Sequence, residues 1–145
     1  MTFWLAIDAR GRLMAKRVDR ESPVQIAIVE YLRKVLPPDN IVHHARGEIN
    51  RGGASFMREL AKAKRKGALP GFPDLVVLTY QGALFFEVKA EGNYADKNQK
   101  AMHESMKSMG YRVAVVRSID DVQECLAEWG VGTRVVDVPL RGVVT

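Results

Sequence analysis

Three charged residues interrupt a largely apolar segment that runs from residue 70 to residue 91 and ends with a fourth, Glu91. Asp74 begins the first apolar stretch of this segment, and Glu87 and Lys89 lie near the end of the second. The Gln81-Gly82 pair between the two stretches predicts a β-hairpin with a two-residue turn. In that register Lys89 lies opposite Asp74, Glu87 lies diagonal to Asp74, and all three side chains share one face of the sheet.

Two carboxylates placed in this way could hold a divalent cation. At a separation of about 5 Å they repel each other by roughly 3 kcal/mol in a medium of effective dielectric about 20, and a cation between them removes this cost. Their hard oxygen atoms favour Mg²⁺ or Mn²⁺. The alternative is a solvent-facing strand end with a simple Asp–Lys ion pair. The rest of the hairpin is apolar on both faces, which favours a buried site.

Zinc fits the sequence poorly, because His43, His44, His103 and Cys125 do not have the spacing of zinc ligands. We expect each histidine to have a structural role and Cys125 to be a small buried side chain. A single cysteine cannot form an internal disulfide, which favours a reducing cytoplasm as the location.

One helix is expected to bring Glu21 near these charges. Ser22 is a good N-cap and Pro23 a good first helical residue, so the sequence predicts a helix that starts here. At 100° per residue Glu21 falls in the sector of Ile28, whereas Glu30 falls nearly opposite and is expected to be solvated. Glu21 therefore either supports the site or only complements the positive end of the helix.

A second helix is expected to bring Gln99. The sequence Asp96-Lys-Asn-Gln99 predicts a capping box, which is a complete structural reason for Gln99. Gln99 also shares a helix face with Met102 and Met106, the face expected to pack on the sheet. It could therefore cap the helix, reach the site, or do both.

The order of the expected elements indicates a single mixed α/β domain over residues 1–145, with helices packed on a small central sheet in the order α-β-β-β-α-β. A hairpin over residues 3–17 precedes the helix that starts near Ser22. The central hairpin is followed by the helix from Asp96 to Met109, a strand from residue 111 and a helix from Ser118. An extension over residues 130–145 is expected to contain an edge strand at residues 133–138.

The positive charge of the chain is concentrated before the central hairpin. The net charge is +5, and residues 1–73 hold 14 Lys and Arg against 7 Asp and Glu, whereas residues 74–145 hold 8 against 10. A basic, polarised domain favours a polyanionic partner, nucleic acid first, although a solvated helix face explains the charges equally well. Whether residues 54–66 form a helix or a mobile arm is open. The densest basic cluster consists of Arg58, Lys62, Lys64, Arg65 and Lys66.

Absent patterns argue against several other classes of protein. No apolar run approaches the ~20 residues of a membrane helix. Asp8 and Arg10 interrupt the apolar N-terminal stretch, so we expect no signal peptide and no membrane partner. The chain has neither a Gly-x-x-x-x-Gly-Lys-Ser/Thr nor a Gly-x-Gly-x-x-Gly segment, so we expect no nucleotide cofactor.

The sequence Pro73-Asp74, followed by Glu87-Val88-Lys89, resembles the signature of the PD-(D/E)xK nuclease superfamily. Further features resemble one branch of it, the virus-type replication-repair nuclease (VRR-NUC) domain. They are the helix start Glu21-Ser22 with Gln25, the approach "GALPGFPDL" to the aspartate, and Gln99 followed by "GYRVAVVRS". The resemblance covers about residues 21–129 and leaves out the N-terminal hairpin and the C-terminal extension.

The resemblance implies a restriction-endonuclease-like core and metal-dependent hydrolysis of DNA phosphodiester bonds. It implies that Asp74 and Glu87 hold Mg²⁺ or Mn²⁺, helped by the Val88 carbonyl and the helix carboxylate of Glu21. Lys89 would orient or activate the attacking water, with Gln99 beside it. Stand-alone members of this branch resemble dimeric resolvases of branched DNA, so the resemblance also implies a homodimer that cuts structures such as the Holliday junction.

The basic cluster, together with Arg46 and Arg51, is expected to grip the DNA backbone through contacts that are mainly electrostatic and independent of base sequence. This long basic stretch cannot be aligned with family positions. Tyr94, in the loop after the lysine, could stack on an unpaired base or pack within its own loop. Two other functions stay open: a catalytically silent DNA-binding module of the same fold, and a partner-binding domain that uses the apolar tail.

Overall fold

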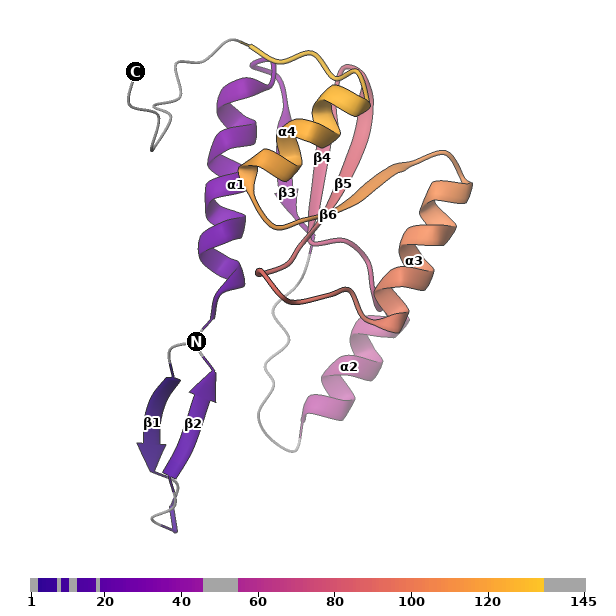
Figure 1. Ribbon diagram of the computed structural model, residues 1–145. Helices are drawn as coiled ribbons and strands as arrows, with labels where there is room; N and C mark the ends of the chain where they lie inside the picture. Colours follow the sequence, from indigo (N-terminus) through magenta and orange to yellow (C-terminus); the bar gives the residue numbers. More distant parts are fainter. Residues whose placement is uncertain (1–2, 8, 11–12, 18, 46–54, 135–145) are drawn as a thin grey trace, which may run out of the picture.

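The computed structural model of the chain describes residues 3–7, 9–10, 13–17, 19–45 and 55–134 (Figure 1). The elements follow in the order β1 (Phe3–Ile7), β2 (Leu13–Arg17), α1 (Glu21–Val35), β3 (Ile41–His44), α2 (Phe56–Arg65), β4 (Leu75–Thr79), β5 (Gly82–Val88), α3 (Lys97–Ser108), β6 (Arg112–Val116) and α4 (Ile119–Glu128). Within the described ranges, none of the helices has the length and apolar character needed to cross a membrane.

A four-stranded sheet in the order β3-β4-β5-β6 forms the centre of the molecule. β3, β4 and β5 are antiparallel neighbours, whereas β6 runs parallel to β5. A parallel neighbour needs a crossover connection, and α3 supplies it. Helices α1 and α4 lie together beside the sheet, and α3 lies apart from them (Figure 1). The predicted mixed α/β fold is confirmed, and the structure adds α2 between β3 and β4.

The larger core lies between the sheet and the helices α1 and α4. β5 contributes Leu84 and Phe86 to it, both fully buried. The predicted apolar stripe of α1 is confirmed, because Ile28, Tyr31, Leu32 and Val35 are buried and Val24 packs at the edge. The side of the central hairpin that faces this core is apolar throughout, as the sequence predicted.

A smaller core lies between the other face of the sheet and α3. It consists of Phe85, Met106 and Val113, with partly buried side chains around them. The ring of Phe85 meets the rings of Phe72 and Tyr111 edge to face, at centroid distances of 5.8 and 5.7 Å. These contacts fix α3 against the sheet and so position the first turn of that helix.

The start of α1 differs from the prediction. The helix begins at Glu21, before the predicted cap Ser22. The carboxylate of Asp19 accepts hydrogen bonds from the backbone N–H groups of Glu21 and Ser22, each at 3.1 Å, and from the Ser22 hydroxyl. The bond from the Ser22 side chain is the main reason that the pKa of Asp19 is lowered. The prediction of Ser22 as cap was wrong because a carboxylate just upstream is the stronger acceptor.

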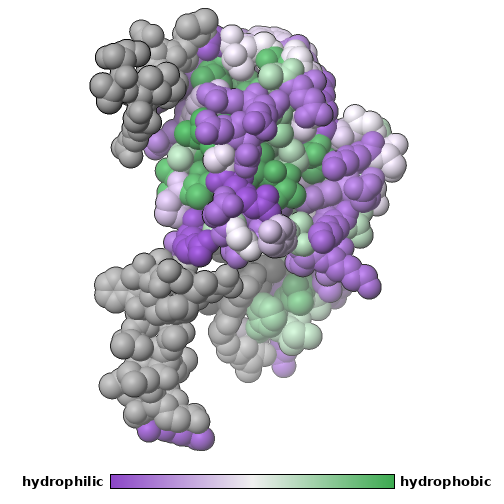
Figure 2. Space-filling model, viewed as in Figure 1, coloured by the Kyte–Doolittle hydropathy of each residue, from purple (hydrophilic) through white to green (hydrophobic). Residues whose placement is uncertain are grey.

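The basic segment is a helix over its described part, which settles one question that the sequence left open. All five residues of the predicted cluster are exposed. Phe56, Leu60 and Ala63 of α2 are partly buried and face a cavity beside the site. An apolar part of the surface of α2 is visible as the green area low in the molecule in Figure 2.

The N-terminal hairpin is confirmed as an antiparallel pair of strands, β1 with β2, in which Phe3 pairs with Arg17. It forms a sheet separate from the central one. The edge strand predicted at residues 133–138 lies almost wholly outside the described residues, as do Arg46 and Arg51.

Candidate active site

The register of the central hairpin differs from the predicted one. Thr79 pairs with Gly82, so the turn consists of Tyr80 and Gln81 rather than Gln81 and Gly82. The Thr79 hydroxyl donates to the Gly82 carbonyl at 3.0 Å and accepts from the Gln81 N–H at 3.1 Å. Gly82 opens β5 with a φ of 107°. The expectation that glycine lies within a two-residue turn was therefore wrong, because here glycine supplies its positive φ after the turn.

The corrected register changes which charges face each other. Leu75 pairs with Phe86, so the next pair outward sets Asp74 opposite Glu87 instead of Lys89. The parity of the pairing is unchanged, and the predicted common face for the charged side chains is confirmed. Asp74 is 4% exposed and Glu87 is 0% exposed. Two buried carboxylates thus lie on adjacent strands at the open end of the hairpin.

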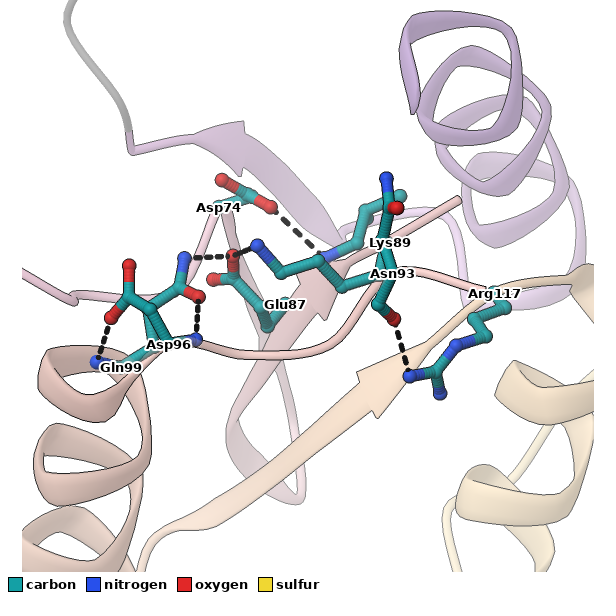
Figure 3. A network of polar contacts seen from close by, with 8 residues as sticks. Asp74, Glu87, Lys89, Asn93, Asp96, Gln99 and Arg117 are labelled. Atoms are coloured by element: carbon teal, nitrogen blue, oxygen red, sulfur yellow. Dashed lines mark hydrogen bonds and ion pairs between the residues drawn. The ribbon is translucent and has the colours of Figure 1, made fainter. Parts of the chain in front are cut away.

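Each carboxylate is held by a donor from its surroundings (Figure 3). The Val88 N–H donates to Asp74 Oδ2 at 2.9 Å, and the Gln99 side chain donates to Glu87 Oε1 at 2.7 Å. The Lys89 ammonium lies 3.5 Å from the same Glu87 oxygen, and its side chain is 12% exposed. The lysine therefore reaches back along its own strand to the glutamate.

Gln99 both caps α3 and reaches the site, the third of the roles that the sequence left open. The side-chain oxygen of Gln99 accepts from the backbone N–H of Asp96 at 2.9 Å. The backbone N–H of Gln99 donates to Asp96 Oδ1, also at 2.9 Å. The remaining amide hydrogens face Glu87. The capping box fixes the side chain of Gln99, and so the first turn of α3 orients the Glu87 carboxylate from outside the sheet.

A model of the VRR-NUC domain family matches residues 12–120, well over half of the chain. The chain belongs to the VRR-NUC domain family. A solved structure described as a "VRR_NUC domain protein" is 26% identical with a TM-score of 0.61, over 79% of this chain and 90% of that one. A second, described as a "VRR_NUC domain", is 26% identical with a TM-score of 0.53, over 77% of this chain and 97% of that one. Among curated proteins, none matches.

VRR-NUC is a family of nuclease domains, so this chain is a nuclease-type domain. Its buried acids are the kind of donor that hard divalent cations bind, and carboxylate oxygens suit Mg²⁺ or Mn²⁺. In the described ranges, however, no three residues among His, Cys, Asp and Glu form a group that could share a metal ion. Such an ion would therefore be held by the two carboxylates together with backbone or water oxygens, and not by a third acidic side chain of the described ranges.

Glu21 is the predicted site residue that the structure does not bring into this group. It is the first residue of α1 and is half-buried, whereas Glu30 is exposed as expected. Its neighbour Gln25, one turn later, contacts His44 with 2.5 Å between Nε2 and Nδ1. Both His43 and His44 are exposed on β3. The catalytic role of Glu21 stays a prediction.

His103, expected from the sequence to be structural, lies on α3 close enough to Asp74 and Lys89 to feel their charges. It is 5% exposed, and its Nε2 has no hydrogen-bond partner in the described part of the chain. Burial is the main cause of its lowered pKa. Lys107 and Lys89 lower the pKa further, while Asp74 and Asp96 oppose the shift. The imidazole is thus neutral at pH 7. Its i, i+4 spacing from Gln99 was the signal for a shared face.

The approach to Asp74 needs a glycine in this VRR-NUC domain. Gly71 has a φ of 83°, and a Cβ there would lie 2.6 Å from the Asn98 carbonyl oxygen. The loop can therefore lie directly against the first turn of α3. A cavity of about 660 Å³ lies between this loop, α2 and that turn, and Gln99 forms part of its wall. The basic helix thus lines the same cavity as Gln99, the residue whose side chain donates to Glu87.

Proposed function

We propose that this VRR-NUC domain is a Mg²⁺- or Mn²⁺-dependent endonuclease that hydrolyses phosphodiester bonds in branched DNA, such as a Holliday junction. The observation that carries the proposal is the pair of Asp74 and Glu87, with the Lys89 ammonium 3.5 Å from Glu87. Burying two acids on adjacent strands costs stability. A cation bound between the two carboxylates would offset this cost, which is a reason for the two acids to be buried together.

Asp74, Glu87 and the Val88 carbonyl would hold the metal ion, which supplies Lewis acidity toward a phosphate oxygen. The chain prepares both carboxylates in advance. The Val88 N–H fixes Asp74, and Gln99, itself fixed by Asp96, fixes Glu87. Such outer contacts set the orientation of ligands and so reduce the reorganisation needed during the reaction.

Lys89 would hold the attacking water or a phosphate oxygen. Its Nζ lies 3.5 Å from Glu87 Oε1, at the edge of the carboxylate pair. A charged ammonium can position a water and stabilise negative charge on the phosphate, but it cannot accept a proton. We assign Lys89 the roles of positioning the attacking water and stabilising charge on the phosphate. We assign Glu21, at the start of α1, a supporting role in catalysis.

The DNA backbone would lie along the exposed basic side of α2. Changing Lys62, Arg65 and Lys66 to Ala should flatten the dependence of log K on log salt by roughly two to three units, since each lost contact removes about 0.9 on duplex DNA. The matched control changes Lys97, Lys100 and Lys107 of α3, which are also exposed. Equal slopes for both triple variants would place the DNA elsewhere.

The proposed function is tested with a panel of duplex, flap, splayed-arm and four-way junction DNA, each with Mg²⁺, Mn²⁺ or EDTA. Cleavage of branched DNA is expected with either metal and not with EDTA. Asp74→Asn should bind DNA without cutting it, and Glu21→Ala should cut more slowly than Glu30→Ala. A wild type that binds but never cuts would leave a catalytically silent DNA-binding module as the function.

We further propose that the domain acts as a homodimer, because symmetric cutting of a junction needs two active sites related by a two-fold axis. The proposal is supported by family resemblance alone. Sedimentation at micromolar concentration is expected to show twice the mass of the 16.2 kDa chain. A single species of monomer mass, with and without junction DNA, would contradict it.

A further inference from the structure

The loop that leaves the active site after Lys89 is anchored from two other parts of the fold. The guanidinium of Arg20, just before α1, donates to the Glu91 carbonyl. Arg117, just after β6, donates to the Asn93 carbonyl at 2.7 Å. Figure 3 shows Asn93 between Lys89 and Arg117. The loop therefore has a defined shape next to the site.

Arg117 is itself held in place. Its backbone N–H donates to Asp121 Oδ2 at 2.8 Å, in the first turn of α4. Its guanidinium carbon lies 5.2 Å from the centroid of the Tyr94 ring, a cation–π contact. The arginine thus fixes both the backbone of the loop and the aromatic side chain that follows it.

Tyr94 is nevertheless 76% exposed. A loop-packing tyrosine would bury its ring, whereas this ring is oriented by a cation and left open to solvent. Only five positions along the chain separate it from Lys89. An exposed aromatic ring on an anchored loop, beside an arginine, is the arrangement on which single-stranded nucleic acids stack their bases.

We propose that Tyr94 and Arg117 form a stacking platform for an unpaired base next to the phosphodiester bond that is cut. The inference rests on the proposed nuclease function and adds a reason for substrate choice. A paired base in a regular duplex cannot place its face on the ring, whereas a base at a flap, a splayed arm or a junction centre can. The platform favours DNA with unpaired nucleotides and needs no particular base, because every base has a π-face.

Tyr80 provides a matched control within the same chain. It is 78% exposed, almost the same as Tyr94. It lies in the turn at the other end of the hairpin, and its hydroxyl donates to Asp39. If any exposed aromatic ring helped to bind DNA, removing either tyrosine would weaken binding. If the platform lies beside the active site, only removal of Tyr94 should do so.

The test uses the Asp74→Asn protein, so that binding is measured without cleavage. A splayed-arm DNA carries 2-aminopurine at the first unpaired position, and a full duplex of the same sequence serves for comparison. Stacking on Tyr94 should quench the fluorescence of the splayed arm. Tyr94→Ala and Tyr94→Leu should each weaken binding of the splayed arm about tenfold and remove the quenching, with duplex binding unchanged. Tyr94→Phe should retain both, and Tyr80→Ala should change neither.

Equal weakening for splayed arm and duplex, or no weakening in either Tyr94 variant, would overturn the platform. Quenching that persists in Tyr94→Leu would do the same. The proposed function fails separately. If the quenching is lost in the Tyr94→Leu variant of Asp74→Asn, but the wild-type protein cuts no DNA with Mg²⁺ or Mn²⁺, the nuclease proposal is contradicted and the platform is supported.

Discussion

One side of β5 carries Phe86 and Val88, which are 0% and 1% exposed, into the larger core beneath α1 and α4. The other side carries Phe85 into the smaller core and Glu87 into the candidate active site, where Lys89, just past the end of the strand, joins it. Successive side chains of a strand point to opposite faces, so a single backbone serves both. The comparison shows how a buried carboxylate is positioned. Packing of Phe86 and Val88 in the core fixes the backbone of β5, and the fixed backbone sets the position of Glu87.

The two sides also differ in how their partners are specified. Side chains on the apolar side pack without directional contacts, and a change in shape there costs stability. Glu87 instead depends on a directed donor from Gln99. Burial of Glu87 therefore lowers stability but gives the carboxylate a defined orientation. Substitutions on the charged side should mainly affect cleavage, and substitutions on the apolar side should mainly affect the free energy of unfolding.

The largest effect is expected from Glu87→Gln. Loss of one carboxylate ligand should lower single-turnover cleavage about a thousandfold, because metal-assisted charge stabilisation contributes several kcal/mol and each 1.36 kcal/mol is tenfold in rate. The midpoint of thermal unfolding in EDTA should be equal to or higher than that of the wild type, since a buried charge is removed. Cleavage near the wild-type rate would show that the site is misplaced.

Phe86→Ala, one residue away on the other side, should show the opposite pattern. The free energy of unfolding is expected to fall by about 3–5 kcal/mol, because the change removes a fully buried ring from the larger core. Urea unfolding measures this loss. A loss below about 1 kcal/mol, outside the range for buried aromatic residues, would contradict the assignment of this side to the core.

Gln99 joins the charged side to helix capping, and paired variants separate these roles. Asp96→Ala should lower the free energy of unfolding by about 1 kcal/mol through the lost cap. Gln99→Ala should cause a similar loss and also reduce cleavage roughly tenfold or more, because an outer contact to Glu87 disappears. If Asp96→Ala reduced cleavage more than Gln99→Ala, the cap rather than the Glu87 contact would be the catalytic contribution.

The smallest effect is expected in how the free energy of unfolding depends on pH, through Cys125, which packs against the larger core. Burial, with the nearby carboxylates of Glu128, Asp121 and Glu124, raises the pKa of Cys125 from 9.0 to about 11. A raised pKa means that the folded state holds the proton more tightly. The stabilisation is complete below pH 9.0 and is lost as the pH rises toward about 11. The wild type should therefore lose slightly more stability than Cys125→Ala across this window, and parallel urea-unfolding curves would contradict it.

The sequence predicted the charged side well because strand alternation depends only on parity. Asp74, Glu87 and Lys89 share a face in the predicted register and in the observed one. Which carboxylate faces which residue depended on the turn, and the conformation of Gly82 could not be read from the sequence. The apolar stripe of α1 was equally clear, since 3.6-residue periodicity survives small errors in helix boundaries.

Contacts between distant segments were the part that the sequence could not specify. The capping box of Gln99 is local and was predicted, whereas its contact with Glu87 depends on how α3 packs on the sheet. Arg20 and Arg117 gave no local signal for the loop that they anchor, because their partners are backbone carbonyls at residues 91 and 93. Helical phase could not place Glu21, since it is the first residue of its helix.

The central claim is that Asp74 and Glu87 together bind a divalent cation. Isothermal titration of the DNA-free protein with Mn²⁺ tests it most directly, with Asp74→Asn, Glu87→Gln and the exposed-site control Glu30→Gln measured alongside. The wild type and Glu30→Gln are expected to bind with the same affinity, and each of the other two variants is expected to bind at least tenfold more weakly. Equal Mn²⁺ binding by all four proteins would contradict the account.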